Sequence, residues 1–436
     1  MRRRLQPTLV IERELAAPLD AVDGRTADGR PYRKALCLAR LHGTPLGLVP
    51  VELPDGHLDA RALADVLARG LEREIADHLA ADDIDSPGRV SADGVGAAGV
   101  PRCLRERADF LAAAPRATVV IPTRERPRIL ERCLEHLVAL EYPSYEIVIV
   151  DNAPTSDGTR RLVSEWRERF PQLRYLREDR PGQSWARNRG LAAASSPLVA
   201  FADDDVVVDR GWLAAIAAAF ASSDRVGCVT GLILPSRLET EAQLLLEQFG
   251  GFNKGFARKT FELDEAAAAD PLFPYAAGRF GSGASMAFDA EVLRAVGGFP
   301  AALGTGSPPC GGEDLTAFLK VVLAGLRLVY EPAAIAYHPH PETYGDLVRQ
   351  LFRYGRGLGA YITSCIVDHG LAASLPSRVL PAARYLLGRK SPRNENRTDA
   401  YPRSLVAAEL LGLAIGPFTY ARGRAAAAAL SRSAEA

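Results

Sequence analysis

The sequence has few cysteines, and none of them are arranged as a pair. Six cysteines are scattered over 436 residues without a CxxC motif: Cys37, Cys103, Cys133, Cys228, Cys310 and Cys365. Such scattering favours reduced thiols over a disulfide framework or a zinc site. We therefore expect a cytoplasmic protein.

The chain also lacks net charge and a long apolar run. Its 53 basic and 53 acidic residues cancel, so bulk electrostatics gives no indication of nucleic acid. Only five of the basic residues are lysine, which together with the alanine runs is typical of a high-GC bacterial genome. No apolar core of a signal peptide follows Met1 and the three arginines at 2–4. The apolar stretch 405–418 contains Glu409 and Pro417 and is shorter than the ~20 residues of a spanning helix, so we expect a soluble protein.

Three segments with different patterns fit a chain of this length. Residues 1–110 indicate a small accessory α+β domain that ends in a linker rich in Gly, Asp and Ser, at residues 82–99. Residues 111–345 alternate between strand and helix patterns, and residues 346–436 form a basic helical extension. The extension suits peripheral contact with anionic lipid at the inner face of the cell membrane. A solvated helical extension fits the same pattern.

The N-terminal segment shows no sign of chemistry in its sequence. Two apolar stretches, 35–41 and 46–53, flank a His-Gly-Thr-Pro turn and predict a hairpin. The histidines His42, His57 and His78 are isolated along the chain, and we expect them to be surface residues rather than metal ligands.

The middle segment predicts a parallel sheet with helices on both faces. Strand patterns at 118–121 and 145–150 are each followed by a helix pattern. Ligands of such sheets bind beyond the carboxyl ends of the strands. Thr123, Asp151 and Asp203–Asp205 would therefore meet there, although they are far apart in the sequence.

An apolar stretch that contains three consecutive aspartates organises this segment. Residues 196–208 predict a strand buried on both faces. Side chains alternate along a strand, so Asp203 and Asp205 would point one way and Asp204 the other. Carboxylates placed side by side suit a hard divalent cation bound to a diphosphate. The alternative is a solvated acidic turn that caps the next helix.

An ordered set of motifs carries a resemblance to a known family. The motifs are Val-Val-Ile-Pro-Thr-Arg at 119–124, Ile-Val-Asp-Asn at 149–152, Asp-Gly at 157–158, Ala-Arg-Asn at 186–188, Asp203–Asp205 and Gly-Gly-Glu-Asp at 311–314. Over roughly residues 116–345 the chain resembles family 2 inverting nucleotide-sugar glycosyltransferases. The resemblance implies a GT-A fold, an α/β class with a mixed, mostly parallel sheet flanked by helices.

The resemblance assigns donor-binding residues. It implies that Pro122, Thr123 and Glu125 line the nucleoside pocket and that Asp151 contacts the base or ribose. Arg187 lies one turn into a helix behind a glycine, where it would meet a phosphate or, alternatively, clamp a carboxylate of the acidic triplet.

The resemblance also implies a divalent metal, Mg²⁺ or Mn²⁺, at the acidic triplet. Asp205, assisted by Asp203 in a DXD motif, would hold the ion against the diphosphate, and Asp203 and Asp204 would contact the donor. His338 is the expected further ligand, with His340 as the alternative.

The Glu313-Asp314 pair is the expected catalytic element. The family pattern makes Asp314 the base and places Glu313 and Gly283 beside the donor sugar. A helix N-terminus favours an ionised carboxylate, so Asp314 is suited to accept a proton from the acceptor hydroxyl. Single displacement would invert the anomeric centre. The alternative is a pair that caps the helix.

The implied activity is hexosyl- or rhamnosyl-type transfer, in cell wall or polysaccharide biosynthesis. The donor would be a nucleoside-diphosphate-sugar, and the acceptor a hydroxyl of a glycan, a lipid-linked molecule or a small molecule. Residues 350–354 resemble the Gln-x-x-Arg-Trp segment of processive synthases, but Tyr354 replaces tryptophan, so we expect non-processive transfer. A sugar nucleotidyltransferase and a non-catalytic carbohydrate-binding protein are the alternatives.

Overall fold

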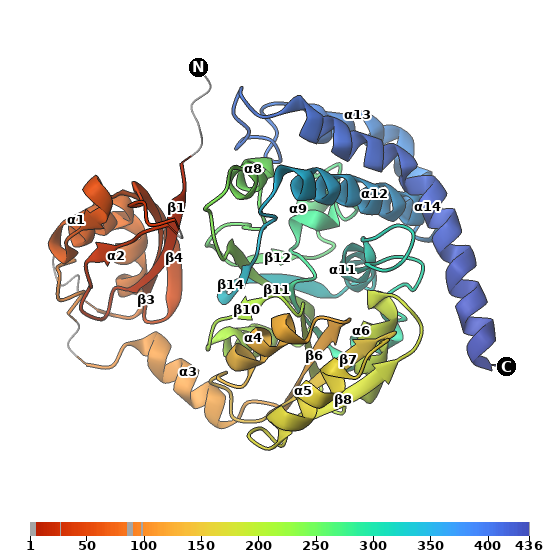
Figure 1. Ribbon diagram of the computed structural model, residues 1–436, viewed down its shortest axis with the longest axis horizontal. Helices are drawn as coiled ribbons and strands as arrows, with labels where there is room; N and C mark the ends of the chain where they lie inside the picture. Colours follow the sequence, from red (N-terminus) through yellow and green to blue (C-terminus); the bar gives the residue numbers. More distant parts are fainter. Residues whose placement is uncertain (1–5, 27, 85–89, 97–98, 436) are drawn as a thin grey trace.

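The computed structural model describes residues 6–26, 28–84, 90–96 and 99–435. The basic start at residues 1–4 and parts of the predicted linker lie outside the described residues. The N-terminal elements lie beside the central sheet on one side, and the C-terminal helices lie on another side of the molecule (Figure 1).

The N-terminal elements form a small α+β unit with a core of its own. Strands β1 (Thr8–Glu14), β3 (Lys34–Leu41) and β4 (Thr44–Glu52) form a sheet in the order β1-β3-β4. Because β3 and β4 pair antiparallel, the predicted hairpin is confirmed. Helices α1 (Ala60–Gly70) and α2 (Glu72–Ala81) contribute leucines to its core.

Helix α3 (Arg102–Ala112) connects this unit to the central sheet. Phe110 and Leu111, in its second half, pack against the core beneath the sheet. The N-terminal unit also contacts the sheet directly, because Arg40 pairs with Asp209 at 2.8 Å and Leu38 packs among residues of the central strands.

Nine strands of the described residues form the central mixed sheet in the order β10-β14-β11-β13-β9-β6-β7-β8, with β12 paired to β14. Their bounds are β6 Ala117–Thr123, β7 Tyr145–Asn152, β8 Leu173–Glu178, β9 Leu198–Ala202, β10 Val207–Val208, β11 Val226–Pro235, β12 Lys259–Phe261, β13 Ser285–Asp289 and β14 Arg327–His338. Strands β9, β6, β7 and β8 pair parallel, and β13 joins antiparallel at β9. The predicted βα units therefore form one half of the sheet.

Alternating residues of the central strands enter two separate cores. Val119 and Ile121 of β6 pack with one set of helices, whereas Val120 packs with the other. The first set is α4 (Pro127–Leu137), α5 (Gly158–Arg167) and α7 (Trp212–Ala221); the second is α6 (Gln183–Ala193), α10 (Ala290–Ala295), α11 (Glu313–Leu323) and α12 (Tyr344–Asp368). This two-sided burial explains the continuous apolar runs of the strands.

The prediction of one strand through the acidic triplet was wrong. Strand β9 ends at Ala202, and residues 203–206 form a turn that the Val206 amide closes onto the Asp203 carbonyl at 3.2 Å. The chain turns here because β9 pairs with β6 and β13, whereas β10 pairs with β14 at the sheet's other end. The turn separates Asp203, which contacts α6, from Asp204 and Asp205, which share Arg126.

The C-terminal helices pack through glycines. Helices α12 and α14 (Arg403–Glu435) cross so closely that a side chain at Gly355 would meet the Glu409 carbonyl, and one at Gly412 would meet the Phe352 carbonyl. Small residues spaced in this way allow two helix backbones to approach each other. Helix α12 also packs on α11, and both helices contribute to the core on one face of the sheet. By packing on α12, α14 stabilises this layer.

Within the described residues, one helical segment is long and apolar enough to cross a membrane. The segment Arg403–Arg432 has a mean hydropathy of 1.4 in its most apolar window, of which 33% is buried in the fold. The expectation that this region is too short was wrong, because the helix continues well past residue 418. Glu409 is buried in it through ion pairs with Arg393 and Arg397. Length and composition alone do not place the helix in a membrane.

Candidate active site

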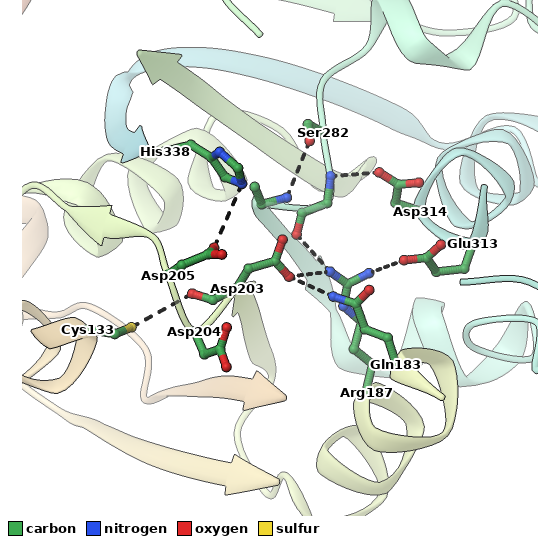
Figure 2. A network of polar contacts seen from close by, with 12 residues as sticks. Cys133, Gln183, Arg187, Asp203, Asp204, Asp205, Ser282, Glu313, Asp314 and His338 are labelled. Atoms are coloured by element: carbon green, nitrogen blue, oxygen red, sulfur yellow. Dashed lines mark hydrogen bonds and ion pairs between the residues drawn. The ribbon is translucent and has the colours of Figure 1, made fainter. Parts of the chain in front are cut away.

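The side chains of the acidic triplet lie at the edge of the central sheet with α6, α11 and β14 around them (Figure 2). Asp204 is the buried member: Thr123 donates to its Oδ2 at 2.7 Å and Arg126 to its Oδ1 at 2.6 Å. Burial raises the pKa of Asp204 to about 7, although Arg126 and Thr123 oppose the shift. Asp204 therefore ties the ends of β6 and β9 together.

Asp203 faces the first turn of α6. Its Oδ1 accepts a hydrogen bond from Gln183 Nε2 at 2.7 Å and one from Arg187 Nη2 at 3.0 Å. Burial raises the pKa of Asp203, and the charge of Arg187 opposes that shift. The carboxylate is therefore held in a fixed orientation beside a cation.

Arg187 joins three separate segments. Its side chain is 1% exposed, and it donates to Glu313 Oε1 at 2.8 Å and to the Gly283 carbonyl at 3.1 Å, besides Asp203. Arg187 thus makes the contact with Asp203 that the clamp alternative describes, and its buried side chain also holds Glu313. Burial raises the pKa of the Glu313 carboxyl, and the negative charge of the neighbouring Asp314 raises it further. The positive charge of Arg187 opposes the shift.

Asp314 lies at the start of α11 and contacts the loop before β13. The Gly283 amide donates to its Oδ2 at 2.8 Å, and the Leu315 amide to its Oδ1 at 2.8 Å. A Cβ at residue 283 would lie 3.0 Å from Asp314 Cβ, so a larger residue there would displace the carboxylate. Gly312 is the N-cap, with a φ of 91° and no side-chain cap. The pair at 313–314 is thus engaged with Arg187 and Gly283 rather than in a capping box.

Asp205 faces His338, the last residue of β14. Asp205 Oδ1 lies 3.8 Å from His338 Nε2, and this oxygen is buried without a hydrogen-bond partner. His340, in contrast, contacts Glu247 Oε1 at 2.7 Å, so of the two histidines only His338 faces the triplet. A buried carboxylate oxygen and a ring nitrogen at this separation fit two ligands of one divalent cation. Arg126 Nη2 donates a hydrogen bond to the other carboxylate oxygen of Asp205, Oδ2, at 2.9 Å.

The predicted nucleoside residues lie at the ends of β6 and β7. Tyr175 donates to Asp151 Oδ2 at 3.0 Å, while Asp151 Oδ1 is buried without a partner. Burial raises the pKa of Asp151. Pro122 is buried within β6, and Glu125 lies in the exposed loop beyond it. The Glu125 carboxylate accepts the Thr155 amide at 2.6 Å, so it joins two loops.

Comparison with known proteins identifies the central part of the chain. Residues 118–281 match the model described as "Glycosyl transferase family 2". Over these residues, the chain is similar to this family. Together with the mixed sheet, the match confirms the GT-A-type α/β fold class expected from the sequence.

Several relatives of this glycosyltransferase domain are similar over little more than half of the chain. Glycosyltransferase AglE of Haloferax volcanii is 25% identical over 248 residues, or 56% of this chain and 73% of that protein. The pre-mycofactocin glycosyltransferase of Mycobacterium tuberculosis is 26% identical over 242 residues, or 55% of this chain and 46% of its own length. The poly-beta-1,6-N-acetyl-D-glucosamine synthase of Staphylococcus aureus is 25% identical over 242 residues, or 55% of this chain and 54% of the relative. The match thus spans about half the length of most of these relatives.

One solved structure in the comparison is the mannosyltransferase PcManGT from Pyrobaculum calidifontis in complex with GDP-Man and Mn²⁺. It is 22% identical, has a TM-score of 0.44, and the alignment covers 72% of this chain and 86% of that one.

Three residues around the glycosyltransferase site were not assigned to it from the sequence. Arg126 and Gln183 bind the acidic triplet, and they lie close to the recognised motifs at 119–124 and 186–188. Tyr354 of α12 is the third: its ring lies 6.4 Å from that of Phe252, which lies 5.1 Å from His338. The Gln-x-x-Arg-Tyr pattern was the signal for it, because Gln350 donates to the Tyr354 hydroxyl.

Proposed function

We propose that the chain is a metal-dependent, inverting, non-processive glycosyltransferase that uses a nucleoside-diphosphate-sugar. One observation supports this proposal above all. The acidic turn that carries Asp203 and Asp205 lies more than a hundred residues before Asp314, yet Arg187 and Gly283 link Asp203 to Asp314 at one site (Figure 2). A solvated turn that only caps the next helix would not need these carboxylates to meet.

The donor would bind across the ends of β6, β7 and β9. Asp151 Oδ1 has no partner, so it would accept a hydrogen bond from the base or the ribose. Asp205 and His338 would hold Mg²⁺ or Mn²⁺, with Asp203 alongside; when bound, the ion offsets negative charge on the diphosphate. Arg126, whose side chain is 42% exposed, would exchange part of its contact with Asp205 for a phosphate.

Asp314 would act as the general base. The Gly283 amide fixes its orientation, and the carboxylate would take the proton of the acceptor hydroxyl as that oxygen attacks C1 of the sugar. Glu313 and Asp203 both bind Arg187, so neither is free to act as a nucleophile in a double displacement. The arrangement therefore supports single displacement with inversion.

A screen of nucleotide sugars tests this function. The full chain is incubated with UDP-, GDP- and dTDP-sugars with Mn²⁺ or with EDTA, and release of nucleoside diphosphate is measured. We expect metal-dependent hydrolysis of at least one donor, at a rate that rises when an acceptor alcohol is added. Release of pyrophosphate from a nucleoside triphosphate and a sugar phosphate would instead identify a nucleotidyltransferase. Inertness toward every donor would favour a non-catalytic carbohydrate-binding protein.

We further propose that the C-terminal helices contact the inner face of the cell membrane and bring the enzyme to a lipid-linked acceptor. Helix α13 (Leu375–Leu387) and α14 lie on the outside of the molecule (Figure 1). They carry exposed apolar residues: Val379, Leu380, Leu387, Leu410, Leu411 and Phe418. Exposed arginines on the same helices, such as Arg403 and Arg422, would interact with anionic headgroups.

Sedimentation with vesicles tests this contact. We expect the protein to sediment with vesicles that contain phosphatidylglycerol but much less with pure phosphatidylcholine. The double variant Leu411→Asp/Phe418→Asp should lose most of the binding. Val100→Asp, at an apolar residue that is 61% exposed in the N-terminal half, is the matched control. Equal recovery of all three proteins in the vesicle pellet would contradict the proposed contact surface.

A further inference from the structure

Four potential metal ligands converge in the N-terminal unit, away from the glycosyltransferase site. His42 lies in the turn between β3 and β4, His78 and Asp82 lie at the end of α2, and Cys103 lies in the first turn of α3. One ligand atom from each lies within 4.8 Å of every other. The expectation that His42 and His78 are isolated surface residues was therefore wrong, since their side chains are only 3% and 11% exposed.

The distances within this cluster are close to those between the ligands of a tetrahedral ion. His42 Nδ1 lies 3.1 Å from His78 Nε2 and 3.0 Å from Asp82 Oδ2, which in turn lies 3.4 Å from His78 Nε2. Cys103 Sγ lies 2.9 Å from Asp82 Oδ2 and 3.9 Å from His78 Nε2. Zinc bonded to N, O and S ligands at its usual bond lengths separates them by about 3.3–3.6 Å.

The backbone that carries the ligands is fixed by a second set of contacts. The Cys103 amide donates to Asp82 Oδ1 at 2.8 Å, which orients that carboxylate. The amides of His42 and Gly43 donate to Glu14 at 2.9 Å each. Partners of this kind orient the ligands of protein metal sites. His42 Nδ1, His78 Nε2 and Cys103 Sγ lie around one oxygen of Asp82, so the four ligand atoms form a compact group of the size that surrounds one cation.

We propose that His42, His78, Asp82 and Cys103 form a structural zinc site. Two imidazoles, a thiolate and a carboxylate are a tetrahedral N/S/O donor set that suits Zn²⁺ and leaves no open position for a substrate. On binding, the Cys103 thiol releases its proton, and the −2 charge of the thiolate and carboxylate balances the ion. His42 and Asp82 are buried and His78 and Cys103 are half-buried, which suits a closed site.

The proposed zinc ion would join three segments that are separate in the sequence. Cys103 begins α3, whose far end packs against the central core through Phe110 and Leu111. The ion would therefore fix the start of α3 to the β3–β4 turn and to α2. In this way it would hold the N-terminal unit in place beside the glycosyltransferase domain.

Metal analysis of the full chain tests the proposal. After dialysis against metal-free buffer, we expect about one tightly bound zinc per chain. Cys103→Ala and His78→Ala should bind zinc at least about 100-fold more weakly, since removal of a ligand costs more than the 10–100-fold typical of an outer contact. Cys310→Ala removes another free thiol, outside the cluster, and should keep the zinc. Circular dichroism checks that each variant is folded.

Cobalt substitution separates this site from the acidic triplet. Co²⁺ bound to a thiolate gives a charge-transfer band in the near ultraviolet, which oxygen ligands do not give. We expect this band in the wild type and in Asp205→Asn, and its loss in Cys103→Ala. If wild-type protein titrated with Zn²⁺ or Co²⁺ neither retains zinc nor develops the band, the proposal is overturned, whether or not the variants fold.

Discussion

Replacing Asp314 with asparagine should lower kcat for sugar transfer by about 10³-fold while the KM for the donor changes little. Asparagine has nearly the same shape and can still accept the Gly283 amide through its oxygen, which in the native protein bonds at 2.8 Å. What it cannot do is take the proton of the acceptor hydroxyl. The effect should therefore appear in the chemical step, measured by steady-state kinetics with a saturating acceptor.

Asp289→Asn is the matched control for Asp314→Asn. Asp289 also lies at a helix start, where it accepts the amides of Glu291 and Val292 at 2.9 Å each, but it is not part of the acidic site. If Asp314 acted only on its helix, both variants would lower stability slightly and leave kcat nearly unchanged. Near-normal turnover in Asp314→Asn would remove it as the base.

Replacing Asp205 with asparagine should weaken metal-dependent binding of the nucleoside diphosphate by about 100-fold or more. Asp205 Oδ1 is the buried oxygen that faces His338 without a hydrogen-bond partner. An amide oxygen carries no charge, so it holds a divalent cation much less tightly. Titration calorimetry with the diphosphate in Mn²⁺ and in EDTA measures the difference.

The exposed Asp224 provides the control for Asp205→Asn, because Asp224→Asn removes the same charge away from the site. Its affinity for the diphosphate should equal that of the wild type in both buffers. In EDTA, Asp205→Asn should differ little from the wild type. An unchanged affinity of Asp205→Asn in Mn²⁺ would show that the ion binds elsewhere.

The N-terminal unit has a physical connection to this site. Arg40 bonds Asp209, four residues after Asp205, at 2.8 Å, and Tyr337, next to His338, donates to Glu12. Both segments that supply the proposed metal ligands are thus held from outside by the same unit. This arrangement gives the accessory unit a positioning role in addition to its own proposed zinc site.

The sequence predicted the parts of the site that follow from strand order. Thr123 and Asp151 end neighbouring parallel strands, and such ends share one edge of the sheet, so their proximity follows from local patterns. The turn at residues 203–206 could not be predicted in the same way. It depends on β10 pairing with β14, a strand more than a hundred residues further along the chain.

Contacts between distant segments were beyond sequence reasoning for the same reason. Arg187 was expected to bind either a phosphate or a carboxylate of the acidic triplet, and its contact with Asp203 depends on how α6 packs beside the end of β9. The cluster around Asp82 was missed because its residues have no motif spacing: they meet through a hairpin, a helix end and the start of α3. In each case the missing information was tertiary packing rather than residue type.

Thermal melting of the wild-type chain with nucleoside diphosphates, with and without Mn²⁺, tests most directly whether the acidic residues form a metal-dependent donor site. A ligand at 100 times its dissociation constant stabilises the folded state by about 2.7 kcal/mol. For a domain of this size, that corresponds to a rise in Tm of about 5 °C. We predict such a rise with at least one of UDP, GDP and dTDP in Mn²⁺ and little change in EDTA. No stabilisation by any of them in Mn²⁺ would contradict the account.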